Sequence, residues 1–169
     1  MRALGIAGLL GLAACAPAPE TGRPLTAQSY AHWSLLPAAS VIAPGQFALA
    51  GATASCDAAP TVLNPHLDDT AAAYGDFIVV NPGRLTGLAP AVQHWAYAHE
   101  CGHIRFGADE ARADCSAVED GARQGWLTRS GLDQVCDYIG TTKADLRHDG
   151  GAARCRAMRV CFAKVANIK

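Results

Sequence analysis

The residues His99-Glu100-Cys101-Gly102-His103 carry the H-E-x-x-H pattern, in which two histidines stand four residues apart and a glutamate follows the first. On an α-helix, both imidazoles lie on one face about one turn apart, so they can bind the same tetrahedral ion. Glu100 lies beside them, toward the open position of such an ion. The pattern predicts a helix that carries two zinc ligands, His99 and His103, and a general base, Glu100.

The flanking sequence favours this helix. Residues 87–90 form a turn, Pro90 can occupy the first helical turn, and residues 91–106 contain no further proline. Gly102 costs about 1 kcal/mol relative to alanine inside a helix. With Ala98 it forms a strip of small residues, which indicates that another element packs closely against the helix.

The segment after the motif offers a third ligand. Gly107 can end the first helix, Asp109 can cap a second one, and Glu110 and Asp114 then share a helical face. We expect Glu110 to complete a His-His-Glu set and Asp114 to accept the second ring hydrogen of a ligand histidine. Asp109 is an alternative third ligand. Another possibility is that the three acidic residues bind no metal and only form a solvent-exposed helix face.

These elements resemble those of the gluzincin metallopeptidases, and the pattern is similar to that of the CAAX prenyl proteases and their periplasmic relatives. Their E-x-x-A-D element corresponds to residues 110–114. Their T-H-P-x-x-x-x-R element corresponds to His148 and Arg154, although Arg147 replaces the threonine and Asp149 the proline. The gap between His103 and the third ligand is shorter than in that family and resembles the spacing of metzincins.

The resemblance implies a zinc peptidase of zincin type, acting on a peptide or protein substrate. In such an enzyme His148 would donate to the oxyanion, and Arg154 would bind a carboxylate. Rival interpretations are another zinc hydrolase, such as an amidase acting on cell-wall peptide, and a non-catalytic envelope-assembly lipoprotein on a zincin scaffold. Tyr74 and Tyr138 are alternative donors to the oxyanion, whereas packing or surface roles are expected for His32, His66 and His94.

The N-terminus predicts export. Residues 1–14 combine Arg2 with a short apolar run, as in a secretory signal peptide. The sequence Leu12-Ala13-Ala14-Cys15 resembles a bacterial lipobox, which implies lipidation of Cys15 and a tether over residues 15–24; residues 16–18 offer an ordinary cleavage site as the alternative. We expect a lipoprotein on the periplasmic face of a bacterial membrane, the outer membrane in a Gram-negative host because Ala16 is not aspartate.

The other cysteines form an even set: Cys56, Cys101, Cys115, Cys136, Cys155 and Cys161. In an oxidising compartment they predict up to three disulfides. A Cys101–Cys115 bridge, which would clamp the two ligand helices, is the first expectation, although helical geometry points Cys101 away from the ligand face. Cys136 paired with Cys155 or Cys161 is the next. No C-x-x-C pair is present, so cysteine ligands to zinc are not expected.

The rest of the chain predicts one compact α+β domain over residues 25–169, with a small sheet and helices dominating after residue 90. The clearest strand is 77–80, either the edge strand that would receive a substrate or an interior one. Weaker strands are expected at 47–50 and 61–63, and further helices at 108–124, 130–139 and 152–165. A net charge of −1 without a basic run gives no indication of nucleic-acid binding.

Overall fold

The most apolar run of the chain forms the interior of a small sheet. The computed structural model describes residues 25–145 and 148–166, so the predicted signal peptide, Cys15 and the tether lie outside the described residues. Strand β6 (Phe77–Val80) is buried at all four positions, as expected for a strand covered on both faces. Of the two alternatives, the interior position is therefore the one found.

The sheet has the strand order β1-β4-β6-β5, in which β4 and β6 run parallel and the other pairs run antiparallel. Its edge on the side of the ligand helix is β5, a short alanine-rich strand that the sequence analysis did not identify. A separate hairpin joins β2 to β3. The other strand bounds are β1 (Val41–Ile42), β2 (Phe47–Leu49), β3 (Ala52–Ala54), β4 (Thr61–Leu63) and β5 (Ala71–Tyr74).

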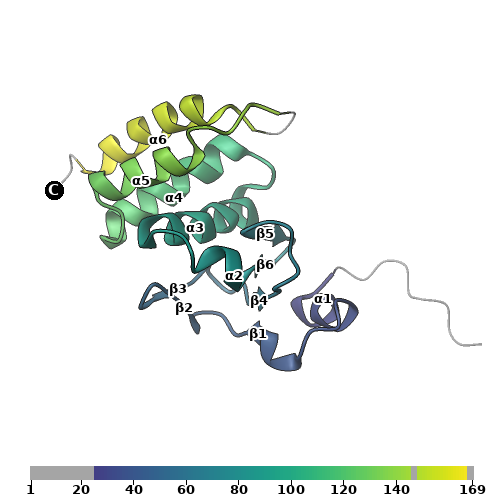
Figure 1. Cartoon of the computed structure of the whole chain (residues 1–169). Coiled ribbons are helices and arrows are strands. Elements are labelled where there is room, and N and C mark those ends of the chain that lie inside the picture. The colour runs from purple at the N-terminus through teal and green to yellow at the C-terminus, as the bar shows by residue number, and fades with distance from the viewer. Residues whose placement is uncertain (1–24, 146–147, 167–169) are drawn as a thin grey trace, which may run out of the picture.

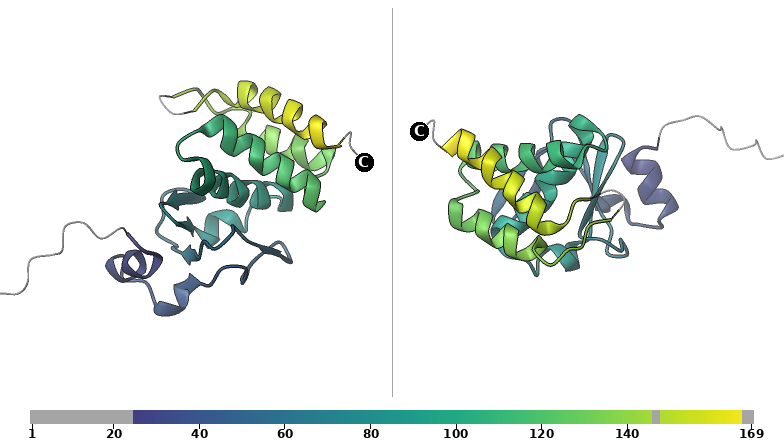
Figure 2. Two further views of the ribbon diagram at one scale, coloured as in Figure 1. Left: turned by 180° about the vertical axis from the view of Figure 1, so that it is seen from behind. Right: turned by 90° about the horizontal axis from the view of Figure 1, so that it is seen from above.

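Helices form the second half of the described chain, and the domain is mixed α+β as predicted (Figure 1). Helix α3 lies between the sheet and the layer formed by α4, α5 and α6, and the view from behind shows the same layering (Figure 2). The bounds are α1 (Ala27–Trp33), the 3-10 turn η1 (Ala38–Ser40), α2 (Pro82–Leu85), α3 (Pro90–Phe106), α4 (Glu110–Gln124), α5 (Arg129–Ile139) and α6 (Gly151–Ala166). None of these helices is long and apolar enough to cross a membrane.

Local signals explain where the helices begin and end. Pro90 occupies the first turn of α3, and Gly107 ends it with a φ of 68°. Asp109 caps α4 by accepting a hydrogen bond from the Arg112 amide. Helix α5 begins one residue earlier than predicted because Thr128 is the residue that caps it, accepting a hydrogen bond from the Gly131 amide.

The close approach expected at Gly102 is present. A Cβ atom at this position would lie 2.6 Å from the Cα of Ala113 and 2.9 Å from the Oγ of Ser116, both on α4. A contact with backbone cannot be relieved by a rotamer change, so a larger residue would push α3 and α4 apart. Gly102 therefore sets the distance between the two helices that carry the predicted ligands.

We predict that Gly102→Ala lowers the free energy of unfolding by about 2 kcal/mol, because overpacking outweighs the gain in helix propensity. Urea unfolding of the purified chain measures this change. Gly83→Ala is the matched control, since its Cβ would meet only the Asn81 side chain at 3.4 Å. Equal stability of Gly102→Ala and the wild type would contradict the packing argument.

The structure contains three disulfides, Cys56–Cys101, Cys115–Cys161 and Cys136–Cys155. The predicted Cys101–Cys115 bridge is wrong, whereas the Cys136–Cys155 pairing is one of the two expected for Cys136. The reason lies in the helix contact: Gly102 faces α4, so its neighbour Cys101 points away from α4 toward the loop that carries Cys56. Cys115, on α4, forms its disulfide with Cys161 on α6.

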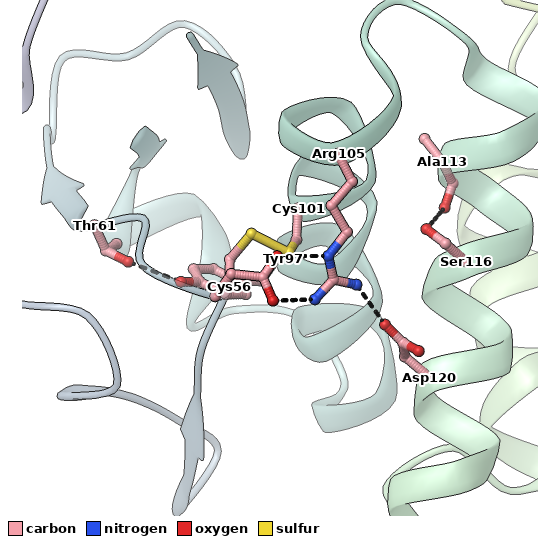
Figure 3. The surroundings of a disulfide bond; sticks show 9 residues. Cys56, Thr61, Tyr97, Cys101, Arg105, Ala113, Ser116 and Asp120 are labelled. Atoms are coloured by element: carbon pink, nitrogen blue, oxygen red, sulfur yellow. Dashed lines mark hydrogen bonds and ion pairs between the residues drawn. A yellow bond between two sulfur atoms is a disulfide. The ribbon is translucent and has the colours of Figure 1, made fainter. Parts of the chain in front are cut away.

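Arg105 supports the same junction (Figure 3). Its guanidinium group binds Asp57, next to Cys56, at 2.8 and 3.0 Å, and also binds Asp120 of α4 at 2.7 Å. Figure 3 shows this ion-pair network beside the Cys56–Cys101 bond. The disulfide and Arg105 together hold the end of α3 to the β3–β4 loop on one side and to α4 on the other.

Helix α1 ends in an unusual way. The Leu36 amide donates to the Ala31 carbonyl and the Leu35 amide to the His32 carbonyl, the two hydrogen bonds of a Schellman motif. The left-handed position of this motif usually holds glycine, yet here it is Leu35, with a φ of 56°. A leucine in this conformation costs about 1 kcal/mol.

Candidate metal centre

Three predicted ligands converge at one point. Nε2 of His99 and Nε2 of His103 lie 3.0 Å apart, and Oε2 of Glu110 lies 3.2 Å from the first and 3.4 Å from the second. Donors bound tetrahedrally at the usual zinc distances lie about 3.3 Å from one another. Gly107 turns the chain sharply at the end of α3, and Asp109 caps α4 only two residues later. Glu110, the first residue of α4, therefore lies against the face of α3 that carries His99 and His103.

The hydrogen bonds on the far side of each ring orient the two histidines. Nδ1 of His103 lies 2.8 Å from the Gly107 carbonyl, which can only accept, so Nδ1 carries the hydrogen. Nδ1 of His99 lies 2.9 Å from Oδ1 of Asp114, the contact expected for Asp114. In the neutral rings, both Nε2 lone pairs therefore face the same point.

This arrangement fits a metal ion. Two facing lone pairs at 3.0 Å repel each other unless a proton or a cation lies between them. Oε2 of Glu110 is buried, and the groups that face it are these same two ring nitrogens. His99, His103 and Glu110 therefore form a group that could hold a metal ion.

The carboxylates control the charge of His99. Burial lowers the pKa of its imidazole, but the contacts with Asp114 and Glu110 outweigh burial and raise it to about 9. Burial raises the pKa of Glu110, but the contact with His99 brings it below its ordinary value. Burial also raises the pKa of Asp114, and there the hydrogen bonds from Arg154 and His99 together lower it below its ordinary value. A proton and a metal ion thus compete for His99, and metal binding must release that proton.

Arg154 of α6 fixes Asp114. Its Nε and terminal nitrogen each donate to one oxygen of the Asp114 carboxylate at 2.8 Å, and Asp114 is only 2% exposed. This two-point ion pair leaves the carboxylate a single orientation, in which Oδ1 also reaches His99. The resemblance implied a carboxylate partner for Arg154, and the structure identifies that partner as Asp114.

Glu100 lies at a cavity beside the ligands. The cavity has a volume of about 480 Å³. Burial raises the pKa of Glu100, against the lowering effect of His99 and His103 and of a hydrogen bond from the Ala73 backbone on β5. The lining includes His99, Glu100, Trp95, Tyr138, His148 and Arg154. A carboxyl group with a raised pKa thus faces this cavity.

His148 also reaches the centre. Its Nε2 lies 3.2 Å from Oε1 of Glu110, and its Nδ1 lies 3.2 Å from Asp145. The ring is half-buried and lines the cavity. Two residues differ from the T-H-P-x-x-x-x-R element. Arg147 lies outside the described residues, and Asp149 is exposed.

The remaining candidates are placed as follows. Asp109 is occupied as the cap of α4, and the group that could hold a metal contains Glu110 instead. Tyr138 lines the cavity, whereas Tyr74 stacks on Phe77. His94 stacks on Trp126. His32 and His66 are exposed.

Trp95 is a site residue that the sequence analysis missed. It lies one turn before His99 on the same face of α3, with the two rings 5.5 Å apart, and its buried Nε1 has no hydrogen-bond partner. The guanidinium of Arg154 lies 5.6 Å from the Trp95 ring. The available signal was its spacing of four residues from His99, which places a tryptophan on the ligand face.

Comparison of the chain with models of protein families, with curated proteins and with solved structures gave no match. The resemblance to gluzincins therefore depends on the motif residues of the sequence.

Proposed function

We propose that this protein is a zincin-type metallopeptidase that hydrolyses peptide bonds with zinc held by His99, His103 and Glu110. The observation that carries the proposal is the convergence of their three donor atoms within 3.4 Å, beside a cavity lined by Glu100. Two nitrogen donors and one carboxylate form a typical catalytic zinc set, which leaves a position for water or substrate. Zinc bound there would supply a Lewis acid that polarises the scissile carbonyl and lowers the pKa of water.

The residues of the chain provide the proton transfers and the orientation. Glu100 accepts a proton from the attacking water and delivers it to the leaving amine nitrogen, and its raised pKa suits a group that must do both. The Arg154–Asp114 pair keeps the His99 ring oriented for binding through Nε2. Strand β5 is an edge strand of the sheet, where an extended peptide would pair its backbone.

A digest of the purified, zinc-loaded chain tests the proposal. A mixed peptide library and a peptidoglycan preparation are incubated in parallel, with and without a chelator, and products are identified by mass spectrometry. Zinc-dependent cleavage of peptides supports the peptidase. Cleavage of peptidoglycan alone would indicate the rival amidase. Zinc binding without turnover on either substrate would favour the non-catalytic lipoprotein.

His148 is proposed to donate to the oxyanion that develops on the attacked carbonyl. We predict that His148→Ala lowers kcat on the order of a hundredfold, because such a donor acts mainly on the transition state. Zinc content and thermal stability should remain close to those of the wild type, since the ring is only half-buried. Steady-state kinetics with the exposed His32→Ala as control measure the effect, and near-wild-type turnover would assign His148 a surface role.

The proposed location is the periplasmic face of a bacterial membrane, with attachment through a lipid on Cys15. It follows from residues 1–15 of the sequence. Mass spectrometry of the processed chain would detect the lipid on Cys15.

A further inference from the structure

Two large apolar side chains project from the end of α1. Trp33 is 73% exposed and Leu35 is 91% exposed, more than any other large apolar residue among those the structure describes. Neither belongs to the two hydrophobic clusters of the domain. Single exposed apolar residues are common on protein surfaces, but two within one turn are a feature that calls for a partner.

The backbone at Leu35 strengthens this point. Glycine would fill the left-handed position of this Schellman motif without strain, but here the residue is Leu35. The next residue, Leu36, makes the inward apolar contact of the motif. Leu35 thus holds a strained conformation without contributing to the described core. Its side chain is available for a contact outside the fold.

The segment that contains this turn lacks charged residues. The sequence contains no Asp, Glu, Lys or Arg from Pro24 to Cys56, a segment that includes α1, β1, β2 and β3. His32 is the titratable residue next to Trp33, and β4, which α1 also contacts, contains no charged residue. A surface that enters the interface of a bilayer avoids the cost of removing charges from water, and tryptophan favours that interface.

We propose that the end of α1, through Trp33 and Leu35, docks into the interfacial region of a lipid bilayer. The chain outside the structure favours this occupant over a protein partner. The nine residues from 16 to 24 separate the predicted lipid on Cys15 from Leu25, and they span at most about 30 Å. The inference thus rests on the membrane attachment in the proposed function, but not on the proposed catalysis.

This orientation leaves the cavity beside the candidate metal centre accessible. In Figure 1, α1 lies beyond the sheet, on the side away from α5 and α6, and the view from above separates them in the same way (Figure 2). Docking through Trp33 and Leu35 therefore turns the helices that carry Tyr138 and Arg154 away from the bilayer. The lipid and this turn would together fix the orientation of the domain.

Fluorescence of the full-length, processed chain in phosphatidylethanolamine–phosphatidylglycerol vesicles tests the proposal. Trp95 is buried and Trp126 half-buried, so the difference between the wild type and Trp33→Phe reports on Trp33. We expect lipids brominated near the headgroup to quench the Trp33 component and the vesicles to shield it from acrylamide. Leu35→Gly should reduce this quenching at least twofold while raising the melting temperature by a few degrees. Val160→Ser, an exposed apolar position on α6, is the control that should change nothing.

Three results would overturn the proposal. Vesicle-bound protein whose Trp33 stays accessible to acrylamide would show that the lipid alone attaches the chain. Protein that does not float with vesicles would refute both membrane attachment and docking, while leaving the zinc-dependent digest as a separate test of catalysis. Shielding of Trp33 without vesicles, together with a doubled mass in light scattering, would assign the turn to a contact between two copies.

Discussion

His103→Ala is expected to weaken zinc binding on the order of a thousandfold, because it removes one of the three proposed ligands. The Nε2 of His103 contacts the donor atoms of both other ligands, at 3.0 Å and 3.4 Å. Its Nδ1 bonds only to the Gly107 carbonyl, so removal of the ring leaves the Asp114–Arg154 ion pair intact. The loss of zinc can thus be measured in a folded protein.

Competition with a chromophoric chelator gives the affinity, and elemental analysis gives the zinc content per chain. His66→Ala removes an exposed histidine and should bind zinc like the wild type. A His103→Ala variant that retained the wild-type affinity would exclude this metal centre. Circular dichroism of both variants checks that the fold is unchanged.

The parts of the fold that were predictable depend on local signals. The proline at the start of α3, the glycines after α3 and α4 and the Asp109 cap lie within a few residues of the boundaries they set. The group that could hold a metal ion, His99, His103 and Glu110, was equally predictable, because a helical spacing and a short turn determine which side chains share a face. Strand β6 could be located since its apolar run is continuous, but the sequence did not determine whether it was central or at an edge.

The parts that could not be predicted depend on contacts between distant segments. The edge strand β5 is mostly alanine and carries no alternation, so only its pairing with β6 defines it. The disulfides depend on how α3 is rotated against α4, and that rotation follows from the 2.6 Å approach at Gly102. The cavity likewise requires Trp95 from α3, Tyr138 from α5 and His148 from the segment before α6 to meet.

Glu100→Gln is expected to abolish hydrolysis while leaving zinc binding intact, with turnover reduced at least on the order of a thousandfold. The amide has nearly the same size, and its oxygen can still accept the hydrogen bond from the Ala73 backbone. It cannot take a proton from the attacking water, however, and the role proposed for His148 is to donate to the oxyanion.

The two variants separate metal binding from proton transfer. His103→Ala should lose zinc and activity together, whereas Glu100→Gln should lose activity with the full zinc content, as measured by elemental analysis and by the peptide digest on the same samples. Glu119→Gln makes the same chemical change on α4, where the side chain pairs with Arg123, and should leave turnover unchanged.

Turnover above a tenth of the wild-type value in Glu100→Gln would mean that another group accepts the proton. Because Glu100 is the carboxylate that both lines the cavity and adjoins the ligand histidines on α3, loss of its proton acceptance is the most direct test of catalysis at this site.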